Sequence, residues 1–256
     1  MPKATGGVTV VIPARYGSSR FPGKPLARLK GQPVIQHVYE RVRSAAGIDR
    51  VIVATDDERI AATVRGFGGT VIVSQEPFRT GTDRVAAVAS QYEGEVFVNV
   101  QGDEIVLHAD LLRDLVDPFV RSGAPMGTLK RRFASGDAVR NPGAVKVVTD
   151  REGWALYFSR APIPHVREAT AAGSVAPPGD PHFLHLGIYG YTRETLLRLA
   201  ALPPGVLEEA EQLEQLRALE HGINIRVWET RHPSLRIDTP EDLAEAERTL
   251  QAGVPC

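Results

Sequence analysis

The chain has 256 residues, of which 43% are hydrophobic and 24% charged, a composition that predicts a globular protein with a substantial core. Its 30 basic and 31 acidic residues nearly cancel, so the overall charge excludes an electrostatic reason to expect nucleic acid or an acidic membrane as a partner. The sequence shows no apolar signal peptide and no apolar run long enough to span a bilayer. The single cysteine, Cys256, cannot form a disulfide within the chain, so we expect a cytoplasmic protein.

The first half of the chain alternates between short β-branched runs and helical patterns. This alternation is typical of βαβ units in a parallel sheet. The strand runs are apolar throughout, which indicates helices on both faces of the sheet. Strands are predicted at Val8–Ile12, Val51–Ala54, Thr70–Val73 and Val96–Val100, and helices at Pro33–Ala46, Asp57–Phe67, Gly81–Gln91 and His108–Val120.

The second half is more mixed. Because no linker separates the halves, residues 1–256 are expected to form a single domain around one sheet, with loose tails at residues 1–7 and 251–256. Pro164–Pro181 is rich in Pro, Gly and Ala and is interpreted as a surface loop. Strands are predicted at Gly127–Arg132, Ala144–Thr149, Phe183–Tyr191, Asn224–Glu229 and Leu235–Ile237, and helices at Arg193–Ala200, Leu207–Glu220 and, capped by Thr239, Pro240–Leu250.

A basic, glycine-rich segment, Ile12–Leu26, directly follows the first strand. Ligands of open α/β sheets gather at the carboxyl ends of the strands, so a site is expected here. The segment contains three cationic residues, Arg15, Arg20 and Lys24, whose positive charges can offset the negative charge of a bound triphosphate. The segment is not a Walker loop. Five residues separate Gly17 from Gly23 where the motif requires four, and Pro25 replaces the metal-binding Ser or Thr that should follow the lysine.

Two predicted strands end in carboxylates. Asp103 follows the strand at Val96–Val100, and Asp238 follows Leu235–Ile237. Magnesium prefers one or two carboxylates together with phosphate oxygens and water. We therefore predict that Asp103 and Asp238 hold Mg²⁺ at the same edge of the sheet as the basic segment.

At these residues the sequence resembles the 3-deoxy-D-manno-octulosonate (KDO) cytidylyltransferases. The matching segments keep their order from about Val8 to Leu250, and their combination is far more specific than any one motif. The segments are Ile12–Leu26, Val98–Glu104, Asn141–Val148, Ala155–Ile163, His185–Tyr191, Glu211–Arg217 and Ile237–Leu243.

The resemblance implies a Rossmann-like nucleotidyltransferase fold, an α/β architecture with a mostly parallel, doubly wound sheet and a mixed second half. It implies a homodimer that requires CTP and Mg²⁺, transfers CMP to the anomeric hydroxyl of KDO, releases pyrophosphate and serves lipopolysaccharide biosynthesis. CMP transfer to a related 2-keto acid sugar, or the reaction of another sugar nucleotidyltransferase, remains the alternative.

The resemblance also assigns roles to residues of this chain. It implies that Arg15, Lys24 and Asp103 are catalytic and that Asp103 and Asp238 bind the metal. Glu211 and Gln215 are placed one turn apart on the predicted helix Leu207–Glu220. The implied nucleotide-binding set is Pro13, Ala14, Arg15, Gly17, Ser18, Lys24, Arg84 and Gln101, and the implied sugar-binding set is Arg160, His185, Tyr189, Glu211 and Gln215.

Two other function classes compete with this interpretation. A glycosyltransferase on a similar frame would typically show an Asp-x-Asp metal motif, and the sequence has none. A non-catalytic nucleotide-binding module would bind CTP without releasing pyrophosphate. The clustering of cations with two metal-type carboxylates argues against such a module, because binding alone does not need them.

Overall fold

A computed structural model describes residues 7–17, 20–106, 108–133, 139–167 and 181–251. Most of each predicted tail (residues 1–6 of 1–7 and 252–256 of 251–256), the site residue Ser18 and most of the predicted loop Pro164–Pro181 lie outside these residues. No helix in the described ranges has the length and apolar character needed to cross a lipid bilayer.

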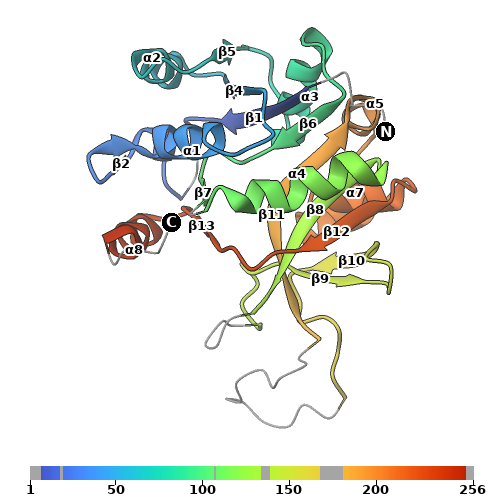
Figure 1. Ribbon diagram of the computed structural model, residues 1–256. Helices are drawn as coiled ribbons and strands as arrows, with labels where there is room; N and C mark the ends of the chain where they lie inside the picture. Colours follow the sequence, from blue (N-terminus) through green and yellow to red (C-terminus); the bar gives the residue numbers. More distant parts are fainter. Residues whose placement is uncertain (1–6, 18–19, 107, 134–138, 168–180, 252–256) are drawn as a thin grey trace.

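The first half forms the parallel part of the sheet (Figure 1). Strand β1 (Val8–Ala14) pairs in parallel with β4 (Arg50–Thr55) and β6 (Val96–Asn99), and β4 pairs with β5 (Val71–Val73). The intervening helices are α1 (Val34–Arg43), α2 (Glu58–Gly66) and α3 (Gly81–Gln91). The predicted βαβ alternation is confirmed.

The long strand β11 (Phe183–Thr192) joins the two halves, because it pairs antiparallel with β6 and also with β8 and β9. One nine-stranded sheet results, with a parallel first half and a mixed second half as predicted. The other elements of the second half are α4 (Asp110–Ser122), β8 (Met126–Arg132), β9 (Lys146–Thr149), β10 (Ala155–Ser159), α5 (Arg193–Ala201), β12 (Ile225–Glu229) and α8 (Pro240–Gln251).

Both faces of the sheet are covered. Successive side chains of a strand point to opposite faces, and Val10 and Ile12 of β1 pack in one apolar cluster with buried residues of α1, α2 and α4. Val11 packs in a second cluster with buried residues of α3 and α5. This division explains why β1 has no polar alternation and confirms the doubly wound architecture.

The predicted helix Leu207–Glu220 is wrong. The segment forms two short helices, α6 (Val206–Glu211) and α7 (Gln215–Glu220), which are separated at Gln212, where φ is +53°. Glu211 therefore ends one helix and Gln215 begins the next, so the two residues are not one turn apart on a single helix.

Several short strands were not predicted. Besides β10, these are the hairpin of β2 (Arg28–Leu29) with β3 (Gln32–Pro33), and β7 (Glu104–Val106). The predicted strand Leu235–Ile237 is present as β13 (Ser234–Arg236), but it pairs antiparallel with β7 in a separate two-stranded sheet and does not join the main sheet. These pairs are too short for a hydrophobic pattern to reveal them.

Candidate functional site

A cleft of about 790 Å³ lies at the carboxyl ends of β1 and β6. It gathers most of the predicted site residues, which come from widely separated parts of the chain. Gly17 and Glu211 do not line it, and Ser18 is not described. The predicted residues that line the cleft are Pro13, Ala14, Arg15, Lys24, Arg84, Gln101, Asp103, Arg160, His185, Tyr189, Gln215 and Asp238.

The basic segment reaches the cleft through a tight turn at Gly23. Gly23 has a φ of +72°, and a Cβ there would lie 2.9 Å from the Tyr16 ring. Its amide donates a hydrogen bond to the Tyr16 carbonyl, and a 3₁₀ turn, η1 (Lys24–Leu26), follows directly. Only glycine suits this combination of positive φ and close packing, and the turn aims Lys24 into the cleft.

Lys24 lies between the two predicted metal-binding carboxylates. Its ammonium group donates hydrogen bonds to Asp103 Oδ2 and, at 3.2 Å, to Asp238 Oδ1. The side chains of Lys24 and Asp103 are only 12% and 11% exposed, so the pair is largely shielded from water. The convergence of Lys24, Asp103 and Asp238, which the sequence predicts, is present.

Short-range packing fixes the positions of both carboxylates. Gly102 lies so close to β1 that a Cβ would stand 3.0 Å from the Pro13 carbonyl oxygen. The Ile237 amide donates to the Asp103 carbonyl, which extends the β7–β13 ladder toward the cleft. The Asp242 carboxylate accepts hydrogen bonds from the amides of Asp238 and Thr239, each at 2.8 Å.

Thr239 completes that arrangement as the predicted cap of α8. Its hydroxyl accepts a hydrogen bond from the Asp242 amide at 3.2 Å, so Thr239 and Asp242 form a reciprocal capping box. The helix start thus fixes the backbone of Asp238 directly.

The donor set fits a hard divalent cation. Asp103 Oδ1 is buried and has no hydrogen-bond partner among the described residues, which is costly unless a ligand satisfies it. Burial by itself would raise the pKa of Asp238, but Arg236, Lys24 and Arg20 outweigh burial and hold that pKa below its ordinary value. Asp238 is therefore ionised at neutral pH, and two carboxylates are typical of a magnesium site.

Arg160, which lines the cleft, and Glu211 form one unit. The Arg160 guanidinium donates to the carbonyls of Pro142, Glu211 and Gln212 at 2.7–3.2 Å. The Glu211 carboxylate accepts hydrogen bonds from the Ser159 hydroxyl at 2.6 Å and the Arg160 amide at 2.9 Å. Glu211 thus contacts the Arg160 backbone, while Arg160 itself lines the cleft.

His185 and Tyr189 face the same side of β11, as their spacing predicts, with ring centroids 5.3 Å apart. Burial lowers the pKa of His185 to about 3, so its imidazole is neutral. The Thr128 hydroxyl lies 3.1 Å from His185 Nε2 and donates to carbonyls of β11. Because the Thr128 hydroxyl donates its hydrogen to those carbonyls, it can only accept a hydrogen bond from His185. We therefore assign the imidazole hydrogen to Nε2, which leaves Nδ1 as an acceptor.

Two buried donors in the cleft lack partners. Arg84 pairs with Asp56 through Nη2 at 2.7 Å, but its Nη1 has no hydrogen-bond partner within the described ranges. The same holds for Gln215 Nε2, whose residue is 5% exposed. Unsatisfied buried donors are costly, so both nitrogens are suited to donating a hydrogen bond to a bound ligand.

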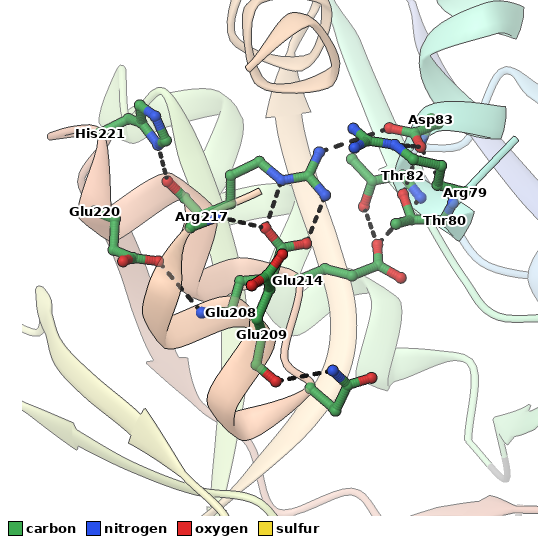
Figure 2. A network of polar contacts seen from close by, with 12 residues as sticks. Arg79, Thr80, Thr82, Asp83, Glu208, Glu209, Glu214, Arg217, Glu220 and His221 are labelled. Atoms are coloured by element: carbon green, nitrogen blue, oxygen red, sulfur yellow. Dashed lines mark hydrogen bonds and ion pairs between the residues drawn. The ribbon is translucent and has the colours of Figure 1, made fainter. Parts of the chain in front are cut away.

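A polar network holds the broken helices against the start of α3 (Figure 2). Arg217 forms a buried ion pair with Glu208, with its Nε 2.7 Å from Oε2, and lies 3.8 Å from Asp83. Glu214 accepts a hydrogen bond from the Thr82 hydroxyl at 2.7 Å. The break at Gln212 allows this fold-back, which places Gln215 in the cleft wall.

The residue sets that the resemblance implies omit two arginines that contact Asp238. Arg20 Nη2 lies 3.1 Å and Arg236 Nε lies 3.2 Å from Asp238 Oδ2. Arg20 belongs to the basic segment, and its charge was the available signal. Arg236 is two residues from Asp238 on β13, but only the ladder with β7 brings it to the cleft.

Known proteins are similar to this chain over most of its length. Residues 9–225 match the cytidylyltransferase family. The chain is 53% identical over 246 residues to a 3-deoxy-manno-octulosonate cytidylyltransferase of Syntrophotalea carbinolica, covering 95% of this chain and 98% of that protein. It is 47% identical over 253 residues to the enzyme of the same name from Geobacter sulfurreducens, covering 95% and 99%.

A solved structure is similar along the whole chain. It is a CMP:2-keto-3-deoxy-manno-octonic acid synthetase complexed with CTP, with a TM-score of 0.88 and 39% sequence identity. The match covers 97% of this chain and 100% of that structure.

Proposed function

Because this chain belongs to the 3-deoxy-manno-octulosonate cytidylyltransferase family, we propose that it transfers CMP from CTP to the anomeric hydroxyl of KDO and releases pyrophosphate. The observation that carries this function is the meeting of Lys24, Asp103 and Asp238 in a cleft that Arg160 and His185 also line. The cationic end around Lys24 suits a triphosphate, and the surroundings of Arg160 and His185 suit an acidic sugar.

The cationic end binds and orients the triphosphate. Arg15, Arg20 and Lys24 line this part of the cleft, and their charges offset the negative charge that develops on the phosphates during transfer. Lys24 is held by two carboxylates, so its ammonium group is positioned before the nucleotide binds. Positioning and charge neutralisation account for most of the catalysis in such transfers, and no covalent enzyme intermediate is needed.

Asp103 and Asp238 hold the divalent metal, which we propose is Mg²⁺. When bound, the ion neutralises phosphate charge and polarises the phosphoryl group. Both carboxylates already lie against Lys24, and the buried Asp103 Oδ1 provides an acceptor that no described residue satisfies.

The sugar lies against Arg160, His185, Tyr189 and Gln215. Arg160 has guanidinium N–H groups beyond those that bind its three carbonyls, and its planar fork suits the sugar carboxylate. Neutral His185 offers an acceptor and Gln215 Nε2 a donor for hydroxyl groups. Glu211 acts through Arg160 as a positioning residue, since its carboxylate contacts the backbone of that arginine.

The cytosine lies at the wall formed by Arg84 and Gln101, beside the start of α3. Gln101 Nε2 donates to Asn99 Oδ1 at 3.3 Å, and a Cβ at Gly81 would lie 2.9 Å from that nitrogen. The glycine therefore permits the glutamine to pack against α3, and Arg84 Nη1 supplies a donor toward the base.

We further propose that the chain is one domain, acts in the cytoplasm as a homodimer, and supplies an activated acidic sugar for lipopolysaccharide assembly. The direct test is a pyrophosphate-release assay with CTP, Mg²⁺ and KDO, each omitted in turn. Release must require all three components. Equal release with UTP or with a different 2-keto acid sugar would reassign the substrate, and no release would contradict the function.

A further inference from the structure

The β7–β13 ladder has a chemically distinct group of residues at each end. At the cleft end stand Asp103 and Asp238. The last backbone pair at the other end is Val106 with Ser234. His108 lies two residues after the end of β7, and His232 lies two residues before the start of β13. Their rings stack with centroids 4.4 Å apart and an interplanar angle of 19°. Antiparallel register thus brings the two imidazoles together outside the proposed catalytic cleft.

A carboxylate completes this cluster. His108, Asp110 and His232 each offer one ligand atom, and these three atoms lie within 4.8 Å of one another. Asp110 Oδ2 is 3.4 Å from His108 Nδ1, whereas Arg113 lies 3.8 Å from the other oxygen of Asp110. Oδ2 is therefore turned toward the histidines and away from the arginine.

One atom of the cluster is unsatisfied. His108 Nδ1 is shielded from solvent and makes no well-aligned hydrogen bond within the described residues, although Asp110 is near. His232 has a carboxylate beside it, because Asp114 Oδ2 lies 4.0 Å from its Nε2 and accepts a hydrogen bond from the Thr230 hydroxyl at 2.5 Å. An outer carboxylate of this kind orients a metal-binding histidine.

We propose that His108, Asp110 and His232 bind a Zn²⁺ ion, with water or a small anion as the fourth ligand. Two imidazoles and one carboxylate are a typical zinc donor set, and they do not suit Mg²⁺, which takes oxygen ligands. Ligand atoms of a tetrahedral zinc site stand about 3.3 Å apart, so the observed cluster needs an inward movement of about 1 Å. Arg113 and Arg231 line the adjacent cavity of about 760 Å³ and favour an anionic fourth ligand.

The ion would join the start of α4 to the segment between β12 and β13. Both segments connect directly to the ladder that carries Asp103 and Asp238. Zinc would therefore stabilise the ladder at the end opposite Asp103 and Asp238. The inference does not depend on the proposed CMP transfer, because it concerns binding and stability and is tested without substrates.

The test uses the full-length chain without a polyhistidine tag, stripped of metal and then titrated with Zn²⁺ by calorimetry in millimolar Mg²⁺, which keeps the catalytic carboxylates occupied. One Zn²⁺ per chain is expected. His108→Ala and His232→Ala should each weaken binding at least about tenfold. Substituted Co²⁺ should give visible absorption bands of tetrahedral coordination in the wild type and lose them in both variants.

Two controls separate the site from other binding. His221→Ala removes an imidazole that is hydrogen-bonded to the Arg217 carbonyl and does not belong to the proposed zinc site, so this variant should bind Zn²⁺ like the wild type. Asp238→Asn should also leave the Zn²⁺ affinity unchanged. Absence of stoichiometric binding, wild-type affinity in both histidine variants, or loss of binding in Asp238→Asn would overturn the proposal. If an alanine variant unfolds, His108→Gln and His232→Gln provide the same comparison.

Discussion

Lys24 Nζ donates a hydrogen bond of 3.2 Å to Asp238 Oδ1 across 214 positions of the sequence. The same ammonium group contacts Asp103. One lysine thus connects the turn after β1 to both carboxylates at the end of the β7–β13 ladder, and the three side chains occupy one end of the cleft.

Lys24→Met should lower kcat by at least about 100-fold while the protein remains folded, because the lost charge acts on the transition state. Steady-state pyrophosphate release and circular dichroism measure the two effects. Lys30→Met is the matched control, since Lys30 is exposed and its ammonium group, within the described part of the chain, bonds to the Leu250 carbonyl. Near-normal kcat in Lys24→Met would remove Lys24 from the catalytic set.

Asp103→Asn should abolish metal-dependent activity, because an amide replaces a carboxylate that lies in the cleft and has one oxygen unsatisfied. A Mg²⁺ titration of the residual rate gives the measurement. Asp57→Asn serves as the control, since Asp57 caps α2 and does not line the cleft. An unchanged half-saturating Mg²⁺ concentration in Asp103→Asn would refute the ligand role.

Glu211→Ala should raise the KM for KDO about tenfold and change the KM for CTP little, because it releases the backbone of Arg160. Glu211→Gln should recover much of the loss. The glutamine oxygen can still accept a hydrogen bond from the Arg160 backbone N–H, and the glutamine NH₂ group can donate to the Ser159 hydroxyl oxygen. Separate KM values for the two substrates decide the role. Equal loss in the alanine and glutamine variants would indicate that the Glu211 charge contacts the sugar directly.

The buried His185 predicts a pH dependence of stability. Its pKa is about 3 in the folded chain, below the ordinary value of about 6.5, so the unfolded chain takes up more protons as the pH falls below 6.5. As the pH falls from about 6 to about 3, His185 therefore lowers the unfolding free energy by up to about 1.4 kcal/mol for each pH unit. Above about pH 6.5 His185 causes no such loss.

Urea unfolding at pH 7, 6 and 5 tests this pH dependence. His185→Gln should show a smaller loss of unfolding free energy between pH 7 and pH 5 than the wild type. A variant with the same slope as the wild type would show that folding does not lower the pKa of His185.

Arg217→Met should destabilise the protein by about 3–5 kcal/mol, because it leaves Glu208 buried without its partner. The exposed Arg198→Met should stay within about 0.5 kcal/mol of the wild type. Urea denaturation measures both variants. A loss in Arg217→Met no larger than the loss in Arg198→Met would show that the network in Figure 2 contributes little to stability.

Sequence reasoning predicted those features that depend on local pattern. The apolar runs that became β1, β4 and β6 bury residues in both core clusters, so hydrophobicity alone revealed them. The basic segment after β1 was located because ligands gather at that edge of a parallel sheet. Thr239 was identified as a cap because capping depends on neighbouring residues, and its bond to Asp242 confirms it.

The sequence by itself therefore determined the doubly wound architecture, the cationic turn and the pair of acidic residues. Only the tertiary structure decided the break at Gln212, the attachment of Glu211 to Arg160 and the ladder that places Arg236 beside Asp238 and His108 beside His232. The physical reason is distance along the chain. Each of these features depends on register or packing between remote segments, which local propensity and periodicity do not encode.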